Sequence, residues 1–230
     1  MIFEVCTDSI EGVLAAEKLG ANRVELCAAL SVGGLTPNIG LIKQCVSKSN
    51  IEIHVMIRHK EGAFNYSEED VEIMKTDIMA AKKVGVKGVV FGILTNENEV
   101  SNLNKDLVKF SKSLDLEVTF HRAFDFVKNY KNAISKIVEF GFDRLLTSGL
   151  KNNAEEGLGI ISFLQKNFGN SIQIMAGSGI NASNALKIGK SGINNIHFTA
   201  IKQSNDKLNF SMGSGSSIDE DKIKSIISLF

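Results

Sequence analysis

The segments IFEVC (Ile2–Cys6) and RVELC (Arg23–Cys27) decide the fold, because they are two copies of one short strand pattern. Each alternates apolar residues with polar or small ones, which is typical of a β-strand with two different faces. Six further β-branched or aliphatic runs follow along the chain: Ile51–Ile57, Gly88–Phe91, Leu116–His121, Arg144–Thr147, Ile172–Ala176 and Asn195–Phe198. The eight runs begin 21 to 37 residues apart, which is the size of one strand-and-helix unit.

Helical segments separate the predicted strands. Apolar residues recur at i, i+3, i+7 and i+10 over residues 71–81, and capping-box patterns at Asp8–Glu11, Asn153–Glu156 and Ser217–Glu220 mark helix starts. Strands that alternate with helices favour a parallel sheet, and eight such units favour a (β/α)8 TIM barrel. A doubly wound open sheet is the competing fold, but the G-x-G-x-x-G that usually follows its first strand does not occur here.

The repeat also predicts the domain organisation. We expect residues 1–230 to form a single barrel domain, because no linker interrupts the repeat. The stretch between Gln203 and Ser217 is rich in Ser, Asn and Gly. We expect it to be the long loop that follows the eighth strand.

The composition argues against several classes of protein. Lys and Arg total 26 and Asp and Glu total 26, so no net basic field attracts nucleic acid or an anionic membrane. The first residues carry an acid, Glu4, and no basic region, and no apolar run approaches the length of a membrane span. Three cysteines without a C-x-x-C pair fit a reducing compartment. We therefore expect a cytoplasmic protein with no nucleic-acid and no membrane partner.

The predicted strands have one apolar face and one polar face. Residues of one parity, such as Val5 and Leu26, are all apolar and are expected to pack against the helices. The other parity is expected to fill the barrel, and it contains Glu4, Cys6, Glu25, Cys27, His54, Met56, Arg58, Thr119, His121, Gln173, Met175, Asn195 and His197. Barrel interiors are normally filled by Val, Ile and Leu. Two interpretations stay open: a structural network that pairs both glutamates with Arg58 and the histidines, or a functional site at the C-terminal mouth.

The two cysteines that end the first two strands, Cys6 and Cys27, are candidate metal ligands. Neighbouring parallel strands lie about 4.8 Å apart, so the two thiols are within reach of a shared soft metal, Cu(I) or zinc, or of a disulfide. The structural alternative is that both are small buried hydrophobic residues. Cys45 lies in a helical segment and is expected to serve packing alone.

Other strand ends carry groups suited to a small anion. The turn Gly177-Ser178-Gly179 lets backbone N–H groups approach a phosphate, and Ser148 lies in a similar turn after the sixth strand. Arg58 and Arg122 offer positive charge, and parity favours Arg58 because Arg122 is expected to pair with Asp125 unless the chain bends there. Plain tight turns and an Arg–Asp pair that closes a loop are the structural alternatives.

Proton transfer at the mouth is a third kind of chemistry that the strand ends permit. Glu4, Glu25 and His121 are the candidate catalytic residues. Together with the anion-binding candidates, they suggest an enzyme of unknown reaction that acts on a small anionic substrate, including a phosphorylated one. Whether the chain is an enzyme or a metal-binding protein is left open by the residues alone.

Several motifs resemble those of the CutC family of copper-homeostasis proteins: EVC at 4–6, NRVELC at 22–27, GGLTP at 33–37, MIR at 56–58, VTFHRAFD at 118–125, LTSG at 146–149 and MAG at 175–177. The resemblance implies a (β/α)8 barrel and a cytoplasmic protein that binds Cu(I) at Cys6 and Cys27. It also implies a homodimer or a homotetramer. The loop after Arg58 departs from the family pattern, because it reads HKEGAF where the family usually has Pro-Arg-Gly-Gly.

Overall fold

The computed structural model describes the backbone of residues 1–207 and 214–230, and the side chains outside 203–216. Within these residues, eight parallel strands close into a barrel in sequence order. They are β1 (Ile2–Thr7), β2 (Arg23–Leu26), β3 (Glu52–Met56), β4 (Gly88–Phe91), β5 (Glu117–Phe120), β6 (Arg144–Thr147), β7 (Gln173–Ala176) and β8 (Asn195–Thr199). The predicted (β/α)8 TIM barrel is confirmed, with strand ends within one or two residues of the expected ones.

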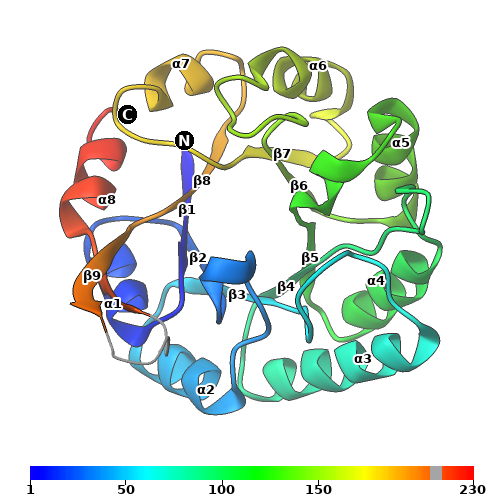
Figure 1. Ribbon diagram of the computed structural model, residues 1–230, viewed down its shortest axis with the longest axis horizontal. Coiled ribbons are helices and arrows are strands. Elements are labelled where there is room, and N and C mark those ends of the chain that lie inside the picture. The colour runs from blue at the N-terminus through cyan, green and yellow to red at the C-terminus, as the bar shows by residue number, and fades with distance from the viewer. Residues whose placement is uncertain (208–213) are drawn as a thin grey trace.

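The helices surround the barrel as an outer ring (Figure 1). They are α1 (Ile10–Lys18), α2 (Ile39–Lys48), α3 (Glu68–Lys83), α4 (Leu103–Ser113), α5 (Tyr130–Phe140), α6 (Leu158–Phe168), α7 (Ala185–Gly189) and α8 (Glu220–Ile227). Two 3-10 helices, η1 (Leu30–Val32) and η2 (Arg122–Phe126), lie in the loops that follow β2 and β5. In the described ranges no helix combines the length and the apolar character needed to cross a bilayer.

The parity of the strand residues separates two layers of packing. Val5, Leu26 and their apolar counterparts share one core with helical residues such as Val13 and Ile42. Cys6, Cys27, Met56 and Val90 form a separate small cluster. The strand face turned away from the helices also carries the buried polar residues, among them Glu4, Glu25, His54 and His197. The predicted polar interior is therefore present.

Two local predictions were wrong. Residues 203–217 were expected to be a loop, but β9 (Ile201–Lys207) and β10 (Ser214–Ile218) pair as an antiparallel ribbon; residues 208–213 lie outside the described part. Main-chain hydrogen bonds hold such a ribbon, so its Ser- and Asn-rich composition does not prevent it. The helix starts were also misplaced: α1, α6 and α8 begin after Ser9, Gly157 and Asp219.

Candidate metal and anion site at the barrel mouth

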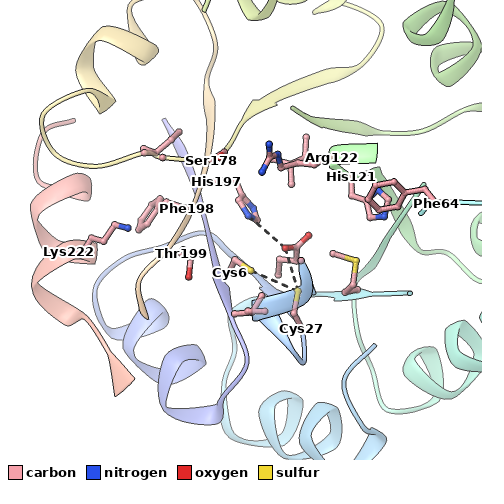
Figure 2. A pocket seen from close by; sticks show the side chains of 17 residues that line it. Cys6, Cys27, Phe64, His121, Arg122, Ser178, His197, Phe198, Thr199 and Lys222 are labelled. Carbon is pink, nitrogen blue, oxygen red and sulfur yellow. Dashed lines mark hydrogen bonds and ion pairs between the residues drawn. The ribbon is translucent and has the colours of Figure 1, made fainter. Parts of the chain in front are cut away.

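A cavity of about 300 Å³ lies at the carboxyl ends of the strands. Strand ends and the loops after them supply its polar lining: Cys6, Glu25, Cys27, His121, Arg122, Ser178, His197 and Thr199. Leu30 of η1 and Phe64, which follows β3, add apolar lining. Figure 2 shows these side chains turned toward a common space. The site thus lies where TIM barrels carry their ligands.

The two cysteines are neighbours because β1 and β2 pair side by side. Cys6 lies opposite Glu25 in the ladder, and the Cys27 N–H donates to the Thr7 carbonyl at 2.9 Å. The Cys6 and Cys27 Sγ atoms are 3.9 Å apart, and the Cys27 Sγ is 3.6 Å from Glu25 Oε2. Both thiols are free and buried. One ligand atom each from Cys6, Glu25 and Cys27 lies within 4.8 Å of the others, so this group is compact enough to hold a metal ion.

The two thiols differ in acidity. The hydrogen bond from Cys27 lowers the pKa of Cys6 to about 5 against the opposing effect of burial, and His197 adds to the lowering. The same bond keeps the proton on Cys27 and, with burial, raises its pKa well above the usual range. Burial and the Cys6 thiolate also raise the pKa of Glu25. One sulfur is therefore a thiolate at neutral pH, which is the form that binds metals.

Glu4 lies beneath the cavity lining and is held by two cations. Arg23 Nε donates to Glu4 Oε2, and His197 Nδ1 is 2.7 Å from Glu4 Oε1. Burial alone would raise the pKa of Glu4, but Arg23 and His197 hold it well below its usual range. Burial lowers the pKa of His197, whereas Glu25, Cys6 and Glu4 outweigh it and raise the value well above normal. His197 thus connects Glu4 to Glu25, whose Oε2 is 3.7 Å from His197 Nε2.

A second polar network fills the opposite, N-terminal end of the barrel. Arg144 donates to Glu117 Oε2 at 2.8 Å and to the side chains of Thr119 and Gln173, both at 3.0 Å. His54 Nε2 is 2.7 Å from Glu52 Oε1. Glu52, His54 and Glu117 are close enough to hold a cation. Arg144 already pairs with Glu117 at 2.8 Å, and Arg23 lies 3.9 Å from Glu52, so two guanidinium groups offset the two carboxylates. The network is therefore a structural one.

Sequence reasoning missed Arg23 and Arg144, and it paired the interior glutamates with Arg58 instead. The signal was present: Arg23 has the same strand parity as Glu25 and begins its strand, as Arg144 begins β6. Arg58 contacts neither glutamate. Its guanidinium donates to the carbonyls of Val32, Gly34 and Gly62 at 2.9 to 3.0 Å. It is 3% exposed and lies outside the cavity lining.

Arg122 does line the cavity, because η2 begins at this residue and bends the chain. Its Nε donates to Asp125 Oδ2 at 2.9 Å and its Nη2 to Ser148 Oγ at 3.0 Å. Asp125 is fixed in turn by Thr147, by Ser148 and by the Leu150 N–H, at 2.5 to 3.1 Å. The turn after β6 therefore surrounds an internal carboxylate, and Ser148 supports Arg122 from outside the cavity lining.

The turn after β7 reaches the cavity with part of its sequence. Ser178 and Gly179 line the cavity and have positive φ angles of 79° and 70°, whereas Gly177 does not line it. Ser178 Oγ donates to the Asn152 carbonyl at 2.8 Å. A serine with this φ is strained, and such strain is concentrated at binding loops.

Two further groups complete the lining. Burial and Arg58 lower the pKa of His121 to about 3, and His121 Nδ1 accepts the Ala123 N–H at 3.3 Å. His121 is therefore neutral. Lys222, in the first turn of α8, was missed because the sequence does not reveal that this helix begins beside the mouth.

Comparisons with known proteins identify relatives of this chain. Residues 1–202 match the family model described as CutC family. Proteins named as family protein CutC from Glaesserella parasuis and Pasteurella multocida are 41% and 43% identical over 204 and 201 residues. These alignments cover 88% and 86% of this chain, and 84% and 82% of the relatives.

The solved structures include a close counterpart. The "Putative Copper Homeostasis Protein CutC" from Streptococcus agalactiae is 32% identical, with a TM-score of 0.78, and the match covers 86% of this chain and 98% of that one. Thiamine phosphate pyrophosphorylase from Pyrococcus furiosus has a TM-score of 0.63 at 14% identity, and the match covers 99% of this chain and 94% of that one. That second likeness shows the fold alone.

Proposed function

The chain belongs to the CutC family, and we propose from this premise that it is a copper-homeostasis protein that binds Cu(I) through Cys6 and Cys27. The observation that carries the proposal is the pair of buried sulfurs, 3.9 Å apart, in the lining of the mouth cavity. Soft thiolate ligands favour Cu(I) over hard cations such as Mg²⁺ and Ca²⁺. Copper is the cargo in this proposal.

The separation of the sulfurs suits a metal with more than two donors. For metal–sulfur bonds of ~2.3 Å, the length found in zinc sites, a 3.9 Å separation corresponds to a sulfur–metal–sulfur angle of roughly 115°. An angle well short of linear leaves one side of the metal open. Glu25, with a ligand atom within 4.8 Å of both sulfurs, offers a carboxylate oxygen, which is a hard donor.

Competition titration tests this function. Reduced protein is titrated with Cu(I) against a chromogenic Cu(I) chelator in the absence of oxygen. We expect one copper per chain, bound tightly enough to remove the metal from the chelator. Transfer of no copper to the protein would refute the proposal. A parallel titration with zinc asks which soft metal the pair prefers.

Location and assembly are part of the same proposal. Free, unbridged thiols are typical of a reducing compartment, so we place the protein in the cytoplasm. We also infer a homodimer or a homotetramer, as the resemblance of the sequence motifs to the CutC family implies. Cell fractionation and light scattering of the purified protein test these two statements.

A second candidate function is an enzyme that acts on a small anionic substrate. The supporting observation is the cavity volume, about 300 Å³, which matches pockets for small molecules and exceeds the needs of one ion. Arg122, Ser178 and Gly179 would hold the anion, and Glu25 or His121 would move a proton. Arg58 ranks behind Arg122 here, because both of its Nη atoms already donate to loop carbonyls. Millimolar phosphate that raises the melting temperature beyond a chloride control would support this function.

A further inference from the structure

Besides the two sulfurs, the cavity offers a positive charge and an apolar surface, which a bare metal ion does not need. Its floor carries the two sulfurs, and its lining also carries a guanidinium and several apolar side chains, among them Met56, Phe64 and Leu146. In the view of Figure 2, Arg122 lies on the other side of His197 from the two cysteines. The lining therefore fits a soft metal ion together with a small organic molecule that has an anionic end.

Arg122 is prepared for a ligand. Asp125 and Ser148 fix its Nε and Nη2, while Nη1 has no partner among the described residues. The side chain remains 40% exposed although it is held at two points. A guanidinium immobilised in this way loses little conformational entropy when it binds a carboxylate.

The metal position that the cysteines would define is also incomplete. The angle derived above leaves one side of the metal open. Glu25 offers only a hard oxygen, and the thioether of Met56, which clusters with both cysteines, is soft but neutral. A third thiolate, which is both soft and charged, suits Cu(I) better than either of these groups. The cavity has space for such a ligand, because both cysteines belong to its lining.

From these observations, and resting on the proposed copper function, we propose that the site accepts Cu(I) together with a low-molecular-weight anionic thiol. The thiol sulfur completes the coordination begun by Cys6 and Cys27, and the carboxylate of the same molecule binds Arg122. The thiol binds as its thiolate, so one proton is released to solvent and no electron is transferred. The substrate class is thus a copper–thiolate complex and not the aqueous ion.

The test uses the reduced, full-length protein loaded with one equivalent of Cu(I). Three probes are compared: 3-mercaptopropionate, the uncharged thiol 2-mercaptoethanol, and propionate, which has no sulfur. Copper X-ray absorption counts the sulfur ligands as each probe is added. We expect a third sulfur at a mercaptopropionate concentration about tenfold lower than for mercaptoethanol, because a charge-assisted bond to Arg122 is gained. Propionate is expected to leave the sulfur count of the copper-loaded protein unchanged.

Arg122→Gln is expected to abolish the preference for the anionic thiol and to retain copper on the two cysteines. Arg122→Lys keeps a cation beside Asp125 and should retain part of the preference. It therefore provides a test even if Arg122→Gln fails to fold. Lys105→Gln, which removes an exposed cation of α4 outside the cavity, is the matched control and should behave as wild type. The inference would be wrong if both thiols added a sulfur at the same concentration in wild type, or if Arg122→Gln kept the full preference for the anionic thiol. Neither result would affect the proposed copper function. Failure to bind copper at all would overturn the inference and the proposed function together.

Discussion

Cys6 and Cys27 are the residues on which copper binding should depend. Cys6→Ser and Cys27→Ser are each expected to weaken Cu(I) binding by about 100-fold or more, because a hydroxyl is a poor ligand for a soft metal. Cys45→Ser is the matched control: Cys45 is buried in α2, and burial raises the pKa of its thiol to about 11. Competition against a Cu(I) chelator measures all three variants. Wild-type Cu(I) affinity in both Cys6→Ser and Cys27→Ser would show that these cysteines are not copper ligands.

His121 should make stability depend on pH in a predictable direction. Its pKa is about 3 in the folded protein against an ordinary value of 6.5. Between these values the unfolded chain binds a proton that the folded chain does not, so the free energy of unfolding decreases as the pH is lowered. The slope contributed by one such group is at most about 1.4 kcal/mol per pH unit.

His121→Gln, which removes this titrating group, should therefore lose stability less steeply than wild type between pH 6.5 and 4.5. Urea denaturation at half-unit pH intervals gives the two curves. The difference between the two curves cancels most of the contribution of the carboxyl groups, because these titrate in both proteins. Parallel curves would mean that His121 is protonated in the fold as readily as in the unfolded chain.

At the scale of elements, Arg58 connects the loop after β2 with the loop after β3. Its three carbonyl contacts join Val32 and Gly34 of one loop to Gly62 of the other, and the Arg58 N–H donates to Thr36 Oγ1 at 2.9 Å. The ring of Phe64 lies 5.2 Å from the guanidinium carbon. The unusual loop sequence after Arg58 is thus still tied to the barrel by this arginine.

We expect Arg58→Ala to lower the free energy of unfolding by about 3 kcal/mol, because three charge-assisted hydrogen bonds are lost and the carbonyl of the buried Gly34 is left unpaired. Urea denaturation measures the change, and Arg122→Ala, at a more exposed position, is the comparison. If Arg58→Ala were as stable as wild type yet lost anion-dependent stabilisation, the arginine would be a ligand group and not a connector.

The strands could be predicted almost to the residue, whereas the helix starts could not. A strand such as Arg144–Thr147 is marked by β-branched or aliphatic residues and by a regular interval from its neighbours. A helix start depends on a single side chain reaching a single N–H. Asn153 Oδ1 does accept the Glu156 N–H at 3.0 Å, but the resulting turn precedes α6 and is not its first turn. A capping pattern therefore identifies a turn more reliably than the helix that follows it.

At the scale of the whole molecule, barrel closure made the site only partly predictable. The cysteine pair follows from adjacent strands, which sequence order reveals. The pairing of Glu4 with His197 joins the first strand to the last and exists only because β8 pairs with β1. Lys222 reaches the mouth because α8 packs beside α1, which no local pattern indicates.

The polar interior makes the barrel depend on charge balance. Glu4 is fully buried between Arg23 and His197, so removing its charge leaves two buried cations without their partner. We expect Glu4→Gln to lower the free energy of unfolding by about 3–5 kcal/mol, as breaking a buried ion pair does. Removing the arginine as well, in Glu4→Gln/Arg23→Met, eliminates one of these two unbalanced cations.

The double variant should therefore be more stable than Glu4→Gln alone. The losses in free energy of unfolding of the two single variants should together exceed the loss of the double variant by at least about 1 kcal/mol. Chemical denaturation of wild type, both single variants and the double variant gives this coupling energy directly. Both cysteines remain in the double variant, so a chelator titration should still detect copper binding wherever the chain is folded. Strictly additive effects would mean that Glu4 and Arg23 stabilise the barrel independently. The interior would then contain two adjacent buried charges that do not stabilise each other.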